Sequence, residues 1–228
     1  MSSLTPLFFA TTAGAALAGA FVGHGVRRSV PWLLRLRDRR RPFAHPWMEA
    51  VTALAFVAVV VRFGLAPPTA GLLLFVVVLV AITAADYRAK LIPDRLSLGG
   101  TLTGLIYAAW VPERLLATPL HVWGLDLAGL PTSGPWAGLA IAGAGALFGF
   151  LVLEAIRLGF GVIVGTEVMG MGDSKLAMLI GAFLGPVGLL GAVLLSFFLG
   201  VVHGAIVLHF SGQPHSPFGP PLAAAALA

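Results

Sequence analysis

The sequence predicts an all-α fold, a polytopic transmembrane helix bundle. Of its 228 residues, 58% are hydrophobic and only 10% are charged, and the mean hydropathy is +0.97. Soluble domains carry about a quarter charged residues, so this chain has too few polar side chains to coat a soluble particle. Its 29 glycines and 16 prolines also fit transmembrane helices, which tolerate both residue types.

Seven apolar segments are long enough to be spanning helices, which need roughly 20 residues each. The Gly185-Pro186 pair interrupts the run 174–210 and favours two helices there. Residues 112–135 combine prolines and glycines with Trp123 and are followed by Trp136, which predicts a segment lying at the membrane interface. A last segment, 219–228, is only a stub, because about 1.5 Å per residue cannot cross a ~30 Å hydrocarbon core. The seven expected helices are 4–25, 47–64, 68–86, 95–111, 136–159, 174–187 and 189–210.

The orientation follows from the basic residues. Residues 27–46 form a short loop whose first fifteen residues contain seven arginines and one acid, Asp38. The positive-inside rule places this loop in the cytoplasm and the N-terminus outside. Because the basic charge lies beside the membrane, we expect contact with anionic lipid headgroups and no nucleic-acid partner. No separate soluble domain is evident, so we treat 1–228 as one membrane domain.

Two aspartates at cytoplasmic helix ends are the candidate catalytic residues. Asp86 ends the third apolar segment, where the helix dipole disfavours a carboxylate, and Asp173 begins the sixth, where the dipole favours one. An aspartic protease needs such a pair, one carboxyl holding a proton and one ionised, to act as acid and base. Gly170 and Gly172 would let a peptide backbone approach closely. The alternatives are an N-cap for Asp173 and helix packing for the glycines.

Other polar residues have simpler interpretations. Asp94 follows Pro93 and precedes a helical run, so we expect it to cap that helix. The chain has no cysteine, which excludes a thiol nucleophile and a cysteine-ligated metal. Its six histidines are scattered without metal-binding spacing, so no metal site is expected.

Four segments together resemble the type IV prepilin peptidase family. GMGDSKLAMLIGAFLG at 170–185 resembles the family's GxGD signature, and DYRAKLIPDRLSL at 86–98 resembles its D-x6-P-x-x-L segment. HPWMEAVTALAF at 45–56 is similar to its P-x-x-E-x-x-T block, and SPFGPPLA at 216–223 to its late PFGP segment. The resemblance implies that Asp86 and Asp173 are catalytic. It also implies that Gly170, Gly172 and Lys175 shape the site around the second aspartate, Asp173. Glu49 and Pro93 match further positions of the family's motifs.

The resemblance implies a membrane-embedded aspartic endopeptidase of the bacterial inner membrane. Such an enzyme removes the short basic leader from prepilin or pseudopilin precursors at the cytoplasmic face, in type IV pilus and type II secretion systems. Longer members carry a cysteine-rich, zinc-binding insert between the first two helices, and many N-methylate the new N-terminus with S-adenosylmethionine. Here the short loop 27–46 stands in that place, so we expect no cofactor, unless methyltransferase activity and its S-adenosylmethionine are retained.

Other classes of protein fit part of this pattern. A proton-coupled transporter could use the same acids as a relay, although they cluster at one membrane face with only Glu154 farther inside a helix. A non-catalytic scaffold for pilus or secretion assembly is a third interpretation. The presenilin group also uses GxGD but pairs it with Tyr-Asp, whereas here the order is Asp86-Tyr87.

Overall fold

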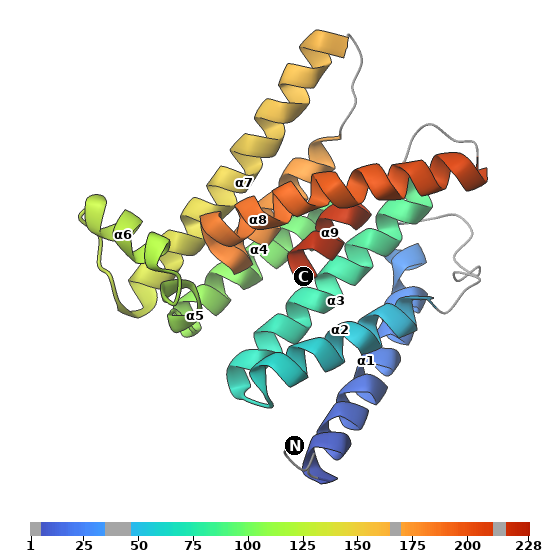
Figure 1. Ribbon diagram of the computed structural model, residues 1–228, viewed down its shortest axis with the longest axis horizontal. Coiled ribbons are helices and arrows are strands. Elements are labelled where there is room, and N and C mark those ends of the chain that lie inside the picture. The colour runs from blue at the N-terminus through green and yellow to red at the C-terminus, as the bar shows by residue number, and fades with distance from the viewer. Residues whose placement is uncertain (1–5, 35–46, 165–169, 212–217) are drawn as a thin grey trace. The chain divides into compact units, whose positions relative to one another are not determined.

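The computed structural model describes residues 6–34, 47–164, 170–211 and 218–228. All elements in these ranges are α-helices, so the predicted all-α fold is confirmed. The chain divides into two compact units, Met1–Ala89 and Lys90–Ala228 (Figure 1). Each unit has its own helices and its own core, and each is described by itself.

The first unit contains three helices, α1 (Pro6–Leu33), α2 (Trp47–Phe63) and α3 (Pro67–Ala89). Helix α1 lies against α2 through two glycines one helical turn apart. A Cβ on Gly19 would lie 2.7 Å from Ala53 Cα, and a Cβ on Gly23 would lie 2.7 Å from Met48 O. Only glycine permits this approach, which is how small residues join helices in membranes.

Helix α1 is longer than hydropathy indicates. It continues through Arg27 and Arg28 to Leu33, so the first part of the expected loop 27–46 is helical. Polar residues end an apolar stretch without ending a helix, because arginine is a good helix former. The remaining arginines of this segment lie in 35–46, outside the described residues.

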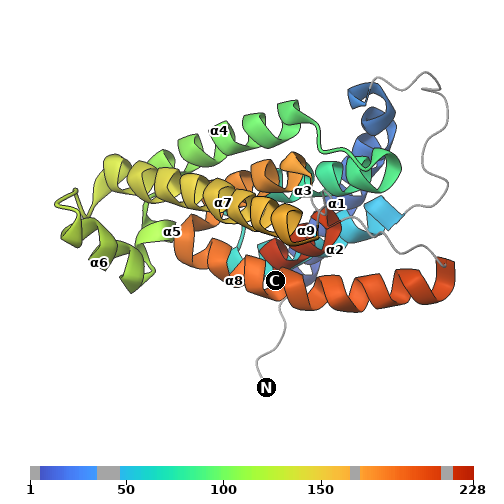
Figure 2. The ribbon, with the colours of Figure 1, turned by 90° about the horizontal axis from the view of Figure 1, so that it is seen from above.

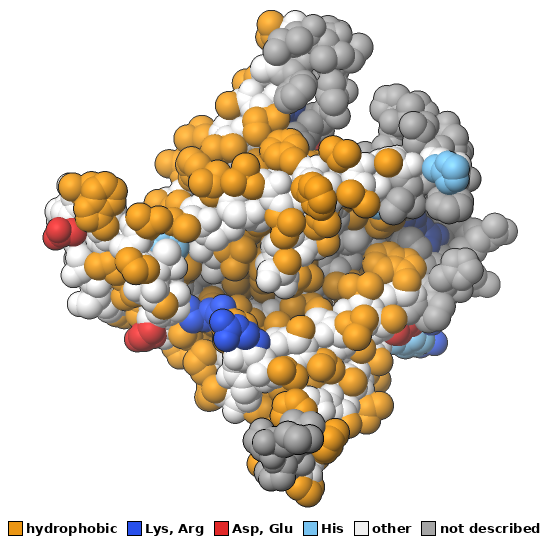
Figure 3. Space-filling model, in the orientation of Figure 1, with side chains coloured by type: hydrophobic (Ala, Val, Ile, Leu, Met, Phe, Trp, Pro, Cys, Tyr) orange, Lys and Arg blue, Asp and Glu red, His pale blue; other side chains and the backbone are white. Residues whose placement is uncertain are grey.

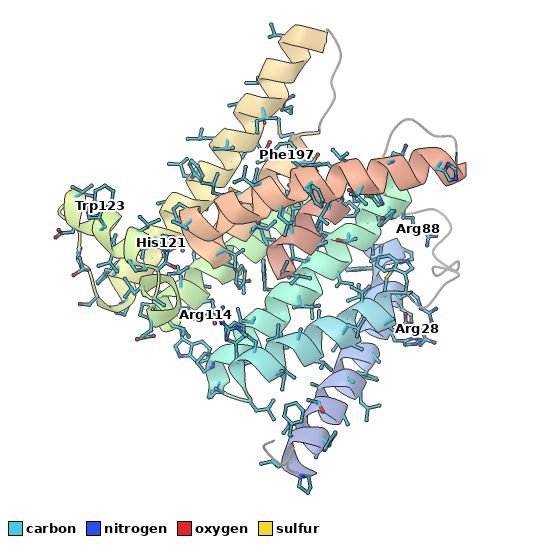
Figure 4. All side chains as sticks on the ribbon, viewed as in Figure 1. Arg28, Arg88, Arg114, His121, Trp123 and Phe197 are labelled. Carbon is cyan, nitrogen blue, oxygen red and sulfur yellow. The ribbon has the colours of Figure 1, made fainter. Side chains whose placement is uncertain are left out.

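The second unit is built around the long helices α7 (Gly134–Val164) and α8 (Met171–Ser211). Helix α7 packs along α8, and α4 (Asp94–Trp110) contacts both, as Figure 2 shows. A last short helix, α9 (Gly219–Leu227), packs on α8, where the rings of Phe197 and Phe218 lie 5.7 Å apart (Figure 4). Side chains such as Leu153, Leu176 and Leu222 are completely buried in this unit.

A break at Gly185 divides α8 into two helices, as the sequence predicts. Gly185 has φ 70° and ψ 178°, a conformation that residues with a side chain rarely adopt, and Pro186 follows it. The expected pair of helices, 174–187 and 189–210, is therefore confirmed, with the break slightly earlier than expected.

The segment expected at the membrane interface contains two short helices, α5 (Glu113–Leu116) and α6 (Pro119–Leu127). They are held by a small core, while Trp123 on α6 is 62% exposed (Figure 4). An exposed tryptophan suits the membrane interface. The core consists of Ala108, Leu115, Leu125, Ala137, Ile141 and Ala142.

Four helices among the described residues are long and apolar enough to cross a membrane: α1, α3, α7 and α8. Helices α2 and α4 have 17 residues each, which is at the lower end of the range for a span. Hydrophobic side chains cover much of the visible surface of the helices (Figure 3), and many large ones are exposed. A multi-pass membrane protein has this kind of surface, because lipid tails cover it.

Candidate active site

Asp86 lies in the last turn of α3, where only 6% of the residue is exposed. The next residue, Tyr87, packs its ring edge-on against Trp47, with 5.9 Å between centroids. Trp47 is the first residue of α2, so the end of α3 and the start of α2 lie at the same end of the first unit. Burial of a carboxyl group in an apolar helix has a substantial free-energy cost, which marks Asp86 as a functional candidate.

Glu49 lies in the first turn of α2, at that same end of the first unit. Its Oε1 is 2.9 Å from Arg27 Nε and 3.2 Å from His24 Nδ1, both on α1. The Glu49 side chain therefore links α1 to α2 next to Gly23, where the two helices approach each other closely. The structure gives this family position a packing role and places it at the end of the unit that carries Asp86.

Asp173 is the third residue of α8 and is partly exposed. Its backbone N–H donates to Gly170 O at 3.1 Å. Helix α8 begins at Met171, so Asp173 lies inside the first turn and the N-cap alternative is wrong. The positive end of the helix dipole still acts on its side chain.

The two glycines of the signature differ in their surroundings. A Cβ on Gly172 would lie 3.0 Å from Ile92 Cβ, so Gly172 lets the start of α8 approach the segment before α4. Gly170 is exposed, and a Cβ there would meet only Gly172 N, at 3.9 Å, among the described residues. Within the part of the chain that the structure describes, packing gives a reason for glycine at position 172 but not at position 170.

Lys175 joins the start of α8 to the start of α4. Its Nζ donates to Asp94 Oδ1 at 2.6 Å. The expected cap at Asp94 is wrong, because Pro93 occupies the N-cap position and no side chain among the described residues caps this end of α4. Asp94 instead lies in the first turn, where its charge complements the dipole and pairs with Lys175. Pro93 O accepts the N–H groups of Leu96 and Ser97.

A polar cluster beside Asp173 was not predicted from the sequence. Glu154 on α7 accepts hydrogen bonds from Arg157 Nε at 3.1 Å and from Ser174 Oγ at 3.1 Å. An acid and a base one turn apart inside an apolar helix are a detectable signal, because such a pair offsets two buried charges. Ser174 gives no such signal, since its partner lies on another helix.

The predicted site residues thus fall into two groups. Asp86 and Glu49 lie at one end of the first unit. Asp173, Gly170, Gly172, Lys175 and Pro93 gather in the second unit, where the start of α8 meets the start of α4. The pairing of Asp86 with Asp173 stays a prediction.

The described residues contain no group of three His, Cys, Asp or Glu side chains that could hold a metal ion. Two of the six histidines, His45 and His215, lie outside those residues. His121 is held by backbone groups, with Nδ1 2.8 Å from Leu115 O.

The fold and these acids define a class, the polytopic membrane proteins that carry ionisable residues at the ends of apolar helices. Residues 73–205 match the model of the type IV leader peptidase family. This region includes both aspartates, and the chain belongs to that family.

Individual relatives agree with the family model. The chain is 36% identical over 203 residues to a prepilin leader peptidase/N-methyltransferase of Aeromonas hydrophila, covering 85% of this chain and 61% of the relative. A protein of the same name from Xanthomonas campestris is 32% identical, with 85% and 62% covered. One from Bacillus subtilis is 30% identical, with 82% and 66% covered. The chain thus spans about three fifths of the length of the first of these relatives. No solved structure matches it.

Proposed function

We propose that this protein is a membrane-embedded aspartic endopeptidase that removes the leader from type IV prepilin or pseudopilin precursors. One observation carries the proposal: the region that matches the family contains Asp86 in the last turn of α3 and Asp173 in the first turn of α8. The names of the relatives support a peptidase acting on prepilins. The polar contacts around Lys175 support a preorganised segment at the start of α8.

In the proposed reaction, Asp86 and Asp173 act on one water molecule. The ionised carboxylate takes a proton from the water as its oxygen attacks the scissile carbonyl carbon. The protonated carboxyl gives its proton to the carbonyl oxygen, and collapse of the tetrahedral intermediate then transfers a proton to the leaving amine. Helix polarity assigns the initial proton to Asp86 and the ionised form to Asp173, because they lie at opposite helix ends.

We propose that the site faces the cytoplasm of the bacterial inner membrane, with the N-terminus outside. The arginines that follow the apolar part of α1 support this orientation and contact with anionic lipid headgroups. Hydrolysis by two carboxyl groups needs no cofactor. The relatives are also named as N-methyltransferases, and that second activity would require S-adenosylmethionine.

The test is cleavage of a prepilin-like precursor by the purified protein in detergent. Asp86→Asn and Asp173→Asn should each remove detectable cleavage while the thermal unfolding midpoint stays near that of the parent. Asp126→Asn is the matched control, because Asp126 is an exposed acid on α6, and it should cleave at the parent rate. Adding S-adenosylmethionine and measuring methyl transfer tests the second activity in the same assay.

The rival classes give different results. A transporter would show proton flux in liposomes that both aspartate variants abolish, with no cleavage. A scaffold would show neither activity. Cleavage that survives either Asp→Asn substitution would contradict the two-aspartate mechanism.

A further inference from the structure

Glu154 and Ser174 connect two helices immediately beside Asp173. The Arg157 guanidinium holds the Glu154 carboxylate: the single N–H of Nε is shared by the two oxygens, each at 3.1 Å, and Nη2 donates to Oε1 at 2.5 Å. Ser174 Oγ donates to the Oε2 atom of that carboxylate at 3.1 Å. The side chains of Glu154 and Arg157 are 18% and 16% exposed, and Ser174 is completely buried. A carboxylate from α7 thus holds the residue that directly follows Asp173.

The neighbours of Asp173 are therefore fixed on several sides within the second unit. Gly172 packs on Ile92, Ser174 is bonded to α7, and Lys175 is bonded to α4. Successive helical residues are about 100° apart around the axis. Once Ser174 and Lys175 are each directed toward a partner, the direction of the Asp173 side chain from α8 is also set.

From this arrangement we infer that Glu154 and Ser174 are positioning residues for Asp173, an inference that rests on the proposed peptidase function. Glu154 acts through Ser174 and does not touch the reacting atoms. Ser174 needs this acceptor because a buried hydroxyl without one has a large desolvation cost. Its nearest alternative is a carbonyl one turn earlier in its own helix, and such bonds bend helices. Loss of Glu154 would therefore release the first turn of α8 and shift Asp173.

The first experiment measures cleavage kinetics. Ser174→Ala should lower kcat about 10-fold with little change in KM, because small misplacement of a catalytic group slows chemistry strongly. Glu154→Ala should have the same effect. Glu154→Gln should restore most of the activity, because its amide oxygen can still accept the Ser174 hydroxyl. Ser196→Ala is the matched control: it removes a buried serine hydroxyl from the same helical element, where it donates to Val193 O far along the chain from Asp173. Its kcat should be unchanged.

The second experiment reports the position of residue 173 without any cleavage. Because the chain has no cysteine, Asp173→Cys introduces a single thiol that can carry a nitroxide spin label. Adding Ser174→Ala or Glu154→Ala should make the label spectrum more mobile, whereas Glu154→Gln or Ser196→Ala should leave it unchanged. Equal spectra for Ser174→Ala and Ser196→Ala would overturn the inference. So would equal kcat values in an enzyme that cleaves. A parent protein that cleaves nothing would refute the proposed function, and the spin label would still decide whether Glu154 positions residue 173.

Discussion

The Val187 N–H donates a hydrogen bond to His121 Nε2 across 3.3 Å, joining the break in α8 to the short helix α6 (Figure 4). The break leaves N–H groups at the start of the second half of α8 without helical acceptors. Since an N–H can only donate, Nε2 must carry the lone pair. The proton of the neutral ring is then on Nδ1, which donates to Leu115 O at 2.8 Å.

His121→Ala should therefore destabilise the second unit. His121 is 6% exposed, and its loss leaves the Val187 N–H without this acceptor, at about 1–3 kcal/mol, while Leu115 O keeps the Thr118 N–H. The measurement is thermal unfolding in detergent, with a lower midpoint expected. The control is Leu120→Ala at an adjacent, 60% exposed position, which should shift the midpoint little. Equal midpoints for the two variants would mean that water replaces the imidazole without loss.

Gly23→Ala should weaken the first unit, because its new Cβ would meet the backbone of Met48 and Glu49 at 2.7–2.8 Å. Separating the helices to remove this overlap costs about 1–3 kcal/mol. Gly25→Ala is the control, since a Cβ there meets nothing within 4 Å. Unfolding midpoints in detergent should fall for Gly23→Ala only. A fall for both variants would indicate that helix flexibility, rather than the close approach, requires glycine.

Lys90→Gly should raise the unfolding midpoint. Lys90 follows the end of α3 with φ 49°, in the left-handed region, which costs about 1–2 kcal/mol for a residue with a Cβ. Lys90→Val should lower the midpoint, because a β-branched residue is rare in this conformation. The same two substitutions at Ala89, the last helical residue, serve as the comparison, and there Gly should be destabilising. If Gly lowers the midpoint at both positions, the left-handed conformation is not costly in this chain.

Asp94→Asn should keep most of the proposed peptidase activity. Its amide oxygen can still accept from Lys175, and Asp94 is 61% exposed, so the lost ion pair contributes about 0.2–1 kcal/mol. A double-mutant cycle with Lys175→Met, read from unfolding midpoints, should give a coupling free energy in that range. An inactive but folded Asp94→Asn protein would show that the carboxylate itself takes part in catalysis.

Much of the fold could be predicted from hydropathy. The expected helices 47–64 and 95–111 correspond to Trp47–Phe63 and Asp94–Trp110 within a residue at each end. Both helices coincide with a mostly apolar stretch, and the start of α4 is further marked by Pro93 directly before it. Hydropathy does not predict the helix ends where a helix continues through polar residues. Helix α1 continues past Arg27, and the polar segment after Trp110 forms α5 and α6.

The sequence predicts candidate site residues, but it does not predict most of their contacts. Motif spacing singles out Asp86, Asp173 and Lys175, because ionisable residues are rare in an apolar chain, and their catalytic role stays a prediction. The partner of Lys175 was not predictable, since Asp94 lies 81 residues away and the contact depends on how α4 packs on α8. The hydrogen bonds of His121 were equally unpredictable, because its partners are backbone groups that the sequence does not distinguish.

The length of α1 has a consequence for its ion pair with α2. The apolar part, Pro6–Val26, is about 31 Å long at 1.5 Å per residue, which equals the thickness of a ~30 Å hydrocarbon core. In the proposed orientation, the last turns, with Arg27 and Arg28, would extend into the headgroup layer. There, lipid phosphates would compete with Glu49 for the Arg27 guanidinium. The ion pair between Arg27 and Glu49 would therefore hold α1 to α2 less strongly as the proportion of anionic lipid rises.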